Sequence, residues 1–239
     1  MFHLRTGIHE NLPLVNQGRI RASFSDSISP IKNSFISLAE MKFASLQVLS
    51  LLILIMASVA EALPVVAIQP LGRVNPQDLA RVQAGIRALY AVDAELLPEM
   101  PMPQTAYYPP RERYKADKLL DSLELAIDKR FTKVIGLTAR DISTSKDDID
   151  DWGIFGLGSL GGRCCVVSTY RLRAGKPSNP VFQARLVKVV NHELGHTFGL
   201  DHCPAVGCLM QDAGGKIATV DGESGIPCAA CAARMLAVK

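Results

Sequence analysis

The sequence has 239 residues, 48% of them hydrophobic, which is enough for one domain with its own core and an N-terminal appendage. Its formal net charge is +3, from 26 Lys and Arg against 23 Asp and Glu that are spread through the chain. No basic run is long enough to form a phosphate-binding surface, which argues against a nucleic-acid partner.

Residues 41–62 have the layout of a secretory signal peptide. Lys42 precedes an uncharged apolar run over 46–59, and Ala60-Glu61-Ala62 forms a small-x-small pattern. We therefore expect cleavage after Ala62. A protein with this signal is exported to the periplasm or the extracellular space.

The forty residues before this segment do not belong to the layout of a signal peptide. We interpret Met41 as the initiator and residues 1–40 as an upstream extension without a structural role. The alternative is a membrane-anchored or cytoplasmic protein, but an apolar run of about 14 residues is shorter than the roughly 20 that a helix needs to span a bilayer. No stable membrane span is expected after cleavage.

From residue 64 onward, strand patterns alternate with helix patterns. Residues 64–71 combine β-branched and apolar side chains and predict a buried first strand, and Asn75 followed by Pro76 is typical of a helix start. Five prolines over 98–110 predict an extended loop, and the polar stretch 141–151 predicts an acidic loop. The other predicted elements are helices over 76–90, 114–129 and 181–198, and strands over 92–97, 133–138, 153–158 and 164–170.

This order of elements predicts one α/β domain over residues 63–239. Its five strands predict a mixed, twisted five-stranded sheet with helices packed on it. Residues 159–162 have the chemistry of a hairpin turn, and the glycines of the strand before it make that strand a candidate sheet edge. From about residue 199 the chain is too short and too rich in glycine to build its own core, so we expect a small irregular C-terminal subdomain.

The last predicted helix carries the pattern HExxH. His192 and His196 are four residues apart, so both imidazoles project from one face and can reach a single zinc ion. Glu193 is expected to face the open coordination position, where its carboxylate can accept the proton of a zinc-bound water and pass it to the leaving amine. The bare pattern also arises by chance in unrelated helices, where its histidines are ordinary surface residues.

A third ligand follows the helix. Gly199 can adopt the left-handed backbone that ends a helix and redirects the chain, and His202 then returns toward the metal. Three protein ligands leave one position open for water and substrate, which is the arrangement of a catalytic zinc site.

Four cysteines follow immediately. Cys203 and Cys208 form one close pair, and Cys228 and Cys231 form a CxxC pair. Four thiolates in two pairs suit a closed tetrahedral site, so we expect a second, structural zinc that stabilises a segment without a core and fixes the position of His202. The alternatives are two disulfides, which an oxidising compartment would favour, or a redox-active CxxC.

The remaining cysteines and two aromatic residues are assigned to packing. Cys164 and Cys165 are adjacent on a predicted strand, so their side chains face opposite sides of the sheet and do not share a ligand sphere. We read both as small core residues. Trp152 and Tyr170 are likewise predicted to pack inside the domain.

The segment 192–231 resembles the archaemetzincin family of metzincin-type zinc metallopeptidases. It reproduces the family signature HExxHxxGxxHCx4CxMx17CxxC at every fixed position, and the stretches YYPPRERYKADKLL and WGIFGLGSLGGRCCVVS are also similar to family segments. The resemblance covers roughly residues 64–235. It implies a zincin-like α+β fold and peptidase activity.

Further roles are implied by this resemblance alone. Met210 matches the methionine of the Met-turn, a hydrophobic floor beneath the histidines. The strand 153–158 is similar to the edge strand that pairs with an extended peptide substrate, for which an unpaired edge is suited. No tyrosine follows Met210, so the tyrosine that assists at the zinc in some metzincins has no counterpart, and oxyanion stabilisation is left to the zinc and backbone groups.

We therefore expect a monomeric zinc peptidase that cleaves peptide bonds. The family likeness implies cleavage from the amino end of short peptides. The rival interpretation is a catalytically quiet zinc-binding module of the same fold. Glu193 argues against the rival, because a purely structural site needs no carboxylate beside an open coordination position. No residue in the sequence indicates a particular substrate.

Overall fold

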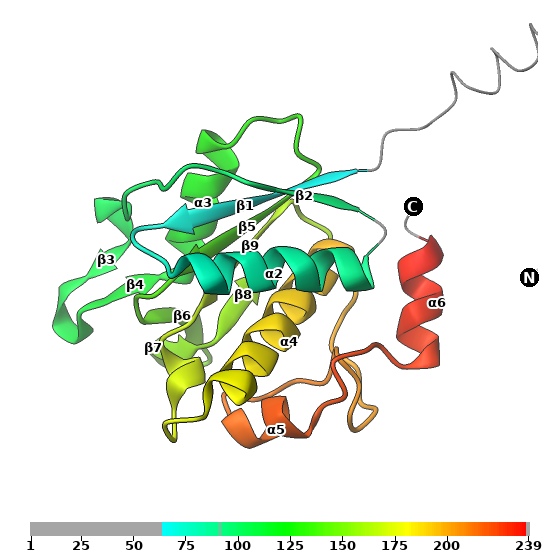
Figure 1. Cartoon of the computed structure of the whole chain (residues 1–239). Coiled ribbons are helices and arrows are strands. Elements are labelled where there is room, and N and C mark those ends of the chain that lie inside the picture. The colour runs from blue at the N-terminus through cyan, green and yellow to red at the C-terminus, as the bar shows by residue number, and fades with distance from the viewer. Residues whose placement is uncertain (1–63, 91, 238–239) are drawn as a thin grey trace, which may run out of the picture. The chain divides into compact units, whose positions relative to one another are not determined.

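The computed structural model describes residues 64–90 and 92–237 (Figure 1). The predicted upstream extension 1–40 and the predicted signal peptide 41–62 lie outside the described residues. Among the described helices, none is long and apolar enough to cross a membrane.

The centre of the domain is the five-stranded mixed sheet that the sequence predicts. Its strand order is β2-β1-β5-β9-β8, in which β8 is an edge strand antiparallel to β9 and the other neighbours are parallel. The predicted hairpin turn over 159–162 joins β8 to β9 and is confirmed. The strands are β1 (Val65–Leu71), β2 (Asp93–Leu96), β5 (Lys133–Thr138), β8 (Gly156–Gly158) and β9 (Cys164–Ser168).

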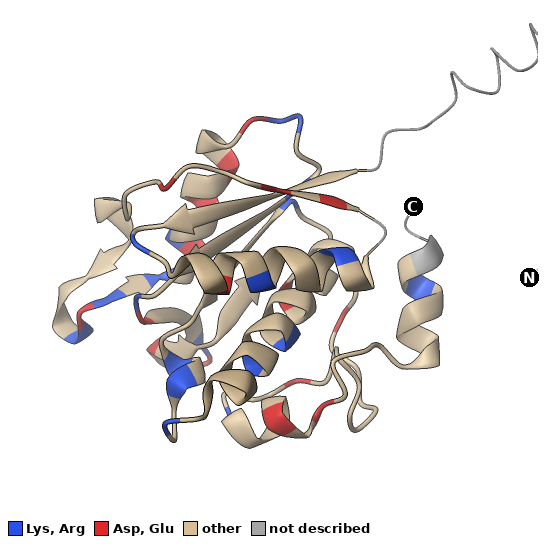
Figure 2. Cartoon of the chain, viewed as in Figure 1, with Lys and Arg blue, Asp and Glu red and all other residues tan. Residues whose placement is uncertain are grey.

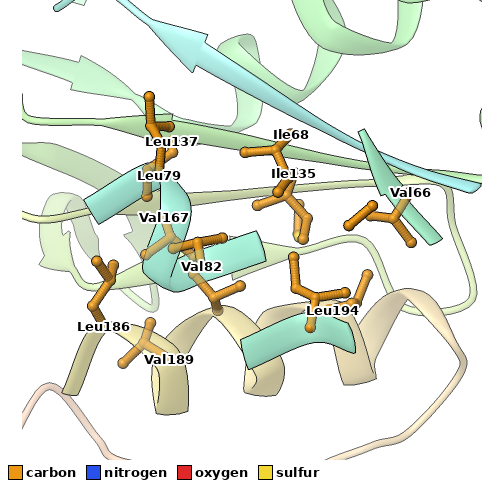
Figure 3. Packing of buried hydrophobic residues seen from close by; sticks show 14 of the residues in the cluster. Val66, Ile68, Leu79, Val82, Ile135, Leu137, Val167, Leu186, Val189 and Leu194 are labelled. Carbon is orange, nitrogen blue, oxygen red and sulfur yellow. The ribbon is translucent and has the colours of Figure 1, made fainter. Parts of the chain in front are cut away.

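Helices cover both faces of this sheet. On one face, α2 (Pro76–Leu89) and α4 (Asn179–Thr197) pack against it, and Leu79, Val82 and Leu194 belong to the resulting core (Figure 3). On the other face, α3 (Ala116–Ala126) forms a second core. Central parallel strands buried on both faces read as continuous apolar runs, which explains why β1 and β5 could be located from sequence.

The adjacent cysteines of β9 show the alternation of a strand. Cys165 contributes to the core under α2 and α4, whereas Cys164 contributes to the core under α3. Both are fully or almost fully buried. Their predicted role as core residues on opposite faces is confirmed.

The helix ends follow local chemistry. The side chain of Asn75 accepts a hydrogen bond from the backbone N–H of Gln77 at 2.9 Å, and Pro76 occupies the first turn of α2, as predicted. Helix α3 is shorter than the predicted 114–129, because Arg113–Lys115 form the short strand β4.

A second, four-stranded sheet was not predicted. Its order is β3-β4-β6-β7, and its outer part is a hairpin formed from the residues that the sequence predicts to be an acidic loop. Asp147 has a φ of 50° in the hairpin turn. The strands are β3 (Tyr107–Tyr108), β4 (Arg113–Lys115), β6 (Ile142–Lys146) and β7 (Ile149–Ile154), and short 3-10 turns are η1 (Gln104–Ala106), η2 (Pro109–Arg111) and η3 (Arg171–Arg173).

Ion pairs explain how such a polar segment forms strands. Asp141 is paired with Arg171 at 2.6 Å and with Arg113 at 3.1 Å, and Asp151 pairs with Arg113 at 3.1 Å. These charges are largely withdrawn from solvent, and each carboxylate has a guanidinium partner. The partners lie far apart in the sequence, so local patterning could not reveal them.

The predicted strand over 153–158 is divided between the two sheets. Gly153 and Ile154 end β7, while 156–158 form the edge strand β8 of the main sheet. The available edge beside α4 is therefore shorter than expected.

The segment after Gly199 has two short helices, α5 (Ile217–Gly222) and α6 (Ala229–Ala237), joined by loops. A small cluster of Leu200, Leu209 and Met210 with cysteines forms its interior. Basic and acidic residues are interspersed over the described ribbon, in agreement with the scattered charges of the sequence (Figure 2).

Candidate metal centre and active-site cleft

Helix α4 positions the histidine pair. It begins one or two residues before the predicted 181–198 and buries its apolar side chains against the sheet. Gly199, with a φ of 81°, ends the helix, and its N–H donates to the carbonyl of His196 at 2.8 Å. The chain then turns back, and His202 lies beside the pair on α4.

The three imidazoles converge. Nε2 of His192 and Nε2 of His196 are 3.1 Å apart, and one ring nitrogen from each of the three histidines lies within 4.8 Å of the other two. A tetrahedral zinc with Zn–N bonds of about 2.0–2.1 Å holds its nitrogens about 3.3 Å apart. The described spacing therefore fits a zinc ion.

Hydrogen bonds orient the two helical histidines. Nδ1 of His192 lies 2.7 Å from the carbonyl oxygen of Leu209, and Nδ1 of His196 lies 2.7 Å from that of Leu200. With Nδ1–H donating to these carbonyls, each Nε2 is left with its lone pair for a metal. Burial lowers the pKa of His192 to about 4 and also lowers that of His196, which favours the neutral, metal-binding form.

Glu193 lies between α4 and the edge strand. It is buried, and it lines the same cleft as the three histidines. Burial raises the pKa of Glu193 to about 8, and the backbone amide of Gly158 lowers it in part. A carboxylate in this position is suited to exchange protons with a group in the cleft.

Met210 packs against α4 at Gly195. Its side chain is fully buried, and a β-carbon on Gly195 would lie 2.6 Å from the sulfur. Gly195 stands between the two helical histidines, so its lack of a side chain lets the methionine approach the backbone of α4. This contact gives a physical reason for the glycine in HELGH.

Tyr90 supports the same part of the helix and was missed from the sequence. Its hydroxyl donates to the carbonyl of Asn191 at 2.6 Å, and its ring stacks on Phe198 with centroids 5.2 Å apart. Tyr90 and Asn191 are 101 residues apart. No spacing pattern in a single sequence could have paired them.

The four C-terminal cysteines form a second cluster. Their sulfur atoms lie within 4.8 Å of one another, and Sγ of Cys203 is 3.8 Å from Sγ of Cys228. All four are free thiols rather than disulfides. A tetrahedral zinc with Zn–S bonds of about 2.3 Å holds its sulfurs about 3.8 Å apart, so the described spacing fits a zinc ion here as well.

Backbone amides point at these sulfurs. Sγ of Cys208 accepts from the N–H of Cys228 at 3.3 Å and from that of Met210 at 3.4 Å. The backbone N–H of Cys231 lowers the pKa of Cys228 to about 7. Both hydrogen-bonding effects favour the thiolate, which is the metal-binding form, whereas burial raises the pKa of Cys208 and of Cys231.

The two clusters are joined by backbone. His202 and Cys203 are consecutive, and the N–H of Cys203 donates to the carbonyl of Met210 at 2.8 Å. This hydrogen bond to Met210 closes the loop that carries His202.

An open cleft of about 410 Å³ runs over the histidines. One wall is the hairpin β6–β7 and the edge strand β8, and the other comprises α4, the loop 211–215 and the end of α5. Trp152, predicted to pack inside the domain, is only half-buried and lines this cleft. The same prediction is wrong for Tyr170, whose exposed fraction is 58%.

Fold and site together define a zinc metallopeptidase: three convergent histidines, a buried glutamate and an edge strand share one cleft. The model of peptidase family M54 matches residues 64–237, and the chain belongs to this family, the archaemetzincins. It is a hydrolase of the zinc metallopeptidase class.

Individual relatives agree with this assignment. The chain is 34% identical to the archaemetzincin of Halobacterium salinarum over 152 residues, which cover 61% of this chain and 84% of that protein. For the archaemetzincin of Methanopyrus kandleri the identity is 36% over 130 residues, covering 54% and 70%.

Solved structures show the same fold. The crystal structure of the Methanopyrus kandleri archaemetzincin superposes with a TM-score of 0.65 at 27% identity, covering 75% of this chain and 97% of that chain. The archaemetzincin of Archaeoglobus fulgidus, solved in complex with malonate, gives a TM-score of 0.62 at 25% identity, covering 71% and 99%.

Proposed function

We propose that this chain hydrolyses peptide bonds with Glu193 as general base and then general acid. The observation that carries the proposal is the position of this buried carboxylate in the cleft that the three histidines line. His192, His196 and His202 would hold a zinc ion, which would supply Lewis-acid chemistry toward a carbonyl and a water. The residues of the chain then have to position the substrate and move one proton.

The raised pKa of Glu193 suits this proton transfer. A base with a pKa near the working pH can take a proton from the attacking water and later release it to the departing amine. Oxyanion stabilisation is assigned to the metal and backbone groups, because no tyrosine follows Met210.

We propose that an extended peptide lies along β8. The N–H of Ser168 donates to the carbonyl of Phe155, and the N–H of Ser159 donates to the carbonyl of Cys164, so alternate residues of this strand face β9. Gly156 and Gly158 fall between them and direct their peptide groups away from β9, where the amide of Gly158 also interacts with Glu193. A substrate strand can pair there whatever its sequence.

We propose a second, structural zinc on Cys203, Cys208, Cys228 and Cys231. The support is the sulfur spacing, the free thiols and the N–H groups that point at them. The small apolar cluster around Leu209 is too limited to order the C-terminal segment alone, so a metal would contribute directly to its folding.

The mode of cleavage is a further part of the proposal. We infer trimming of short peptides from the amino end, an expectation based on the family likeness. Matched peptides with free and acetylated amino ends test it: a strong preference for the free amine supports trimming, and equal cleavage of both overturns it.

The test of the function combines metal analysis and mass spectrometry. Purified protein loaded with zinc is expected to hold two zinc ions per chain and to cleave members of a mixed peptide library. Glu193→Gln is expected to keep both metals and lose cleavage, by roughly a hundredfold or more. Glu99→Gln, which removes an exposed carboxylate outside the cleft, serves as the control.

Two results would overturn the proposal. Cleavage that survives Glu193→Gln would exclude this residue as the base. A zinc-loaded wild type that cleaves no library member would favour the catalytically quiet zinc-binding module instead.

We also propose that the mature protein is an exported monomer that starts after Ala62. The support is the signal-like composition of residues 41–62 and the start of the family match at residue 64, directly behind it. N-terminal sequencing of natively expressed protein tests this, and a mature chain that still carries residues 1–40 would contradict it. Light scattering of the purified protein tests the monomer.

A further inference from the structure

A second buried carboxylate lines the cleft, away from the catalytic chemistry. Glu223 is the first residue after α5, and only 8% of it is exposed. It belongs to the lining of the same cleft as Glu193. Burial raises its pKa to about 7, with Lys188 opposing the shift. The proposed mechanism assigns no role to the Glu223 carboxylate.

The Glu223 carboxylate has no hydrogen-bond donor among the described residues. The nearby ammonium of Lys188 donates instead to backbone carbonyls, including those of Val220 and of Glu223 itself. Other acidic groups of this region are satisfied: Asp212 accepts from the N–H of Gly214 at 2.7 Å, and Asp221 forms a two-point ion pair with Arg185. The carboxylate oxygens remain accessible from the cleft that Glu223 lines. A cationic ligand bound there can therefore supply the donor that the chain does not.

The surroundings of Glu223 indicate the shape of that ligand. Val189, Ala213 and Val220 also line the cleft and pack together in one apolar cluster, from α4, from the loop after Met210 and from α5. These apolar side chains can cover a methylene stem, and a cationic head at its end would meet the carboxylate. Lys and Arg side chains have this construction.

The position of Glu223 relative to α4 indicates that its ligand is a side chain of the substrate rather than the substrate's α-amino group. Val189 and Lys188 precede His192 by about one helical turn, which is roughly 5 Å along the axis. The α-amino group of the residue whose carbonyl is attacked stays two bonds from that carbonyl, beside the histidines. A carboxylate displaced toward the start of α4 is better placed for the end of a long side chain.

We propose that Glu223 is a specificity-determining residue that selects substrates with a lysine or arginine side chain next to the cleaved bond. The inference rests on the proposed peptidase function and adds a substrate class to it. It assigns Glu223 to substrate recognition and gives it no part in proton transfer.

The experiment profiles zinc-loaded wild type with peptides that differ at one position. Lysine is compared with norleucine, which keeps the stem without the charge, and with acetyl-lysine, which keeps the length without the charge. The wild type is expected to favour lysine by about 10- to 100-fold in kcat/KM, the range of a charge-assisted hydrogen bond. In Glu223→Gln the ratio of lysine to norleucine is expected to collapse toward one, whereas Glu99→Gln keeps the wild-type ratio.

Each other result has a defined meaning. Cleavage without preference for a basic residue, or an unchanged ratio in Glu223→Gln, overturns the inference and leaves the peptidase function intact. If Glu223→Gln loses only the discrimination between free and acetylated amino ends, the carboxylate binds the substrate α-amino group. That result also overturns the inference. Absence of any cleavage by the wild type overturns the proposed function, and the inference with it. The wild-type comparison does not depend on the folding of a variant.

Discussion

Gly156 and Glu193 touch across the cleft so closely that a β-carbon on the glycine would lie 2.6 Å from Cγ of the glutamate. The edge strand and the catalytic helix are therefore fitted to each other at the position of the proposed base. Two residues further on, a β-carbon on Gly158 would lie 2.5 Å from the backbone oxygen of Glu193. The two glycines meet different parts of the same residue, and their substitution should have different consequences.

Gly156→Ala should impair catalysis more than folding. The clash is with a side chain that can rotate away, so the free energy of unfolding should fall by about 1 kcal/mol or less, while kcat/KM should fall by roughly 10- to 100-fold as the carboxylate is displaced. Gly158→Ala meets backbone that cannot yield, and we expect a loss of about 2–3 kcal/mol in stability. Urea unfolding and peptide kinetics on both variants measure the difference, and equal losses of stability would contradict this account.

The contact between Gly195 and Met210 predicts that substitutions at these two positions have coupled effects on stability. Gly195→Ala should cost about 1–3 kcal/mol, because the new methyl group meets the methionine sulfur. In a Met210→Ala background the methyl group has room, so the same substitution should cost less, with a coupling of about 0.5–3 kcal/mol. A double-mutant cycle by urea unfolding measures this coupling, and additive effects would show that the close contact is unimportant.

Loss of one cysteine ligand should affect both clusters. If the proposed second zinc is present, Cys228→Ser is expected to lower the zinc content from two ions to one or fewer per chain. The melting temperature should fall as well, since a metal at this site would stabilise the C-terminal segment. Peptide cleavage should fall as well, because Cys203 is bonded to His202. Cys164→Ala removes a thiol in the core under α3 and should leave the zinc content at two, as measured by elemental analysis. An unchanged zinc content in Cys228→Ser would exclude the second site.

The buried Glu223 should make stability depend on pH. Its pKa is about 7 in the fold and 4.5 ordinarily, so the folded protein loses stability as the pH rises from about 4.5 through 7, when the carboxyl group ionises. Glu223→Gln mimics the protonated form and should gain about 1–3 kcal/mol over the wild type at pH 8. The difference should shrink toward pH 5. Denaturant unfolding at matched zinc and several pH values measures it; a constant difference across this range would show that Glu223 does not titrate there.

Much of the fold could be predicted from the sequence because the patterns that indicate its elements involve neighbouring residues. The buried run Val65–Leu71, the Asn75-Pro76 helix start and the strand Lys133–Thr138 all depend on neighbouring residues, and the structure has them at or near the predicted bounds. The convergence of the histidines and of the cysteines could also be predicted, because these residues are closely spaced within 192–231.

Features that depend on distant partners could not be read in the same way. The hairpin β6–β7 contains Asp151, which pairs with Arg113, and it directly follows Asp141, which pairs with Arg113 and Arg171. Both arginines lie outside the hairpin. Tyr90 reaches Asn191 from another helix end, and Glu223 belongs to no motif. Each acquires its role from tertiary contacts that a pattern of neighbours does not contain.

The adjacency of His202 and Cys203 also orders events in time. With a metal in the cysteine cluster, the third histidine is held in place only after Cys228 and Cys231 have been synthesised, and Cys231 is 29 residues further along the chain. A ribosome-bound chain that has reached His202 therefore carries every residue of the histidine cluster but not the means to hold it. Hydrolytic activity would then begin only once this later segment has folded around its own ion, and the growing polypeptide would not be cleaved by its own active site before that.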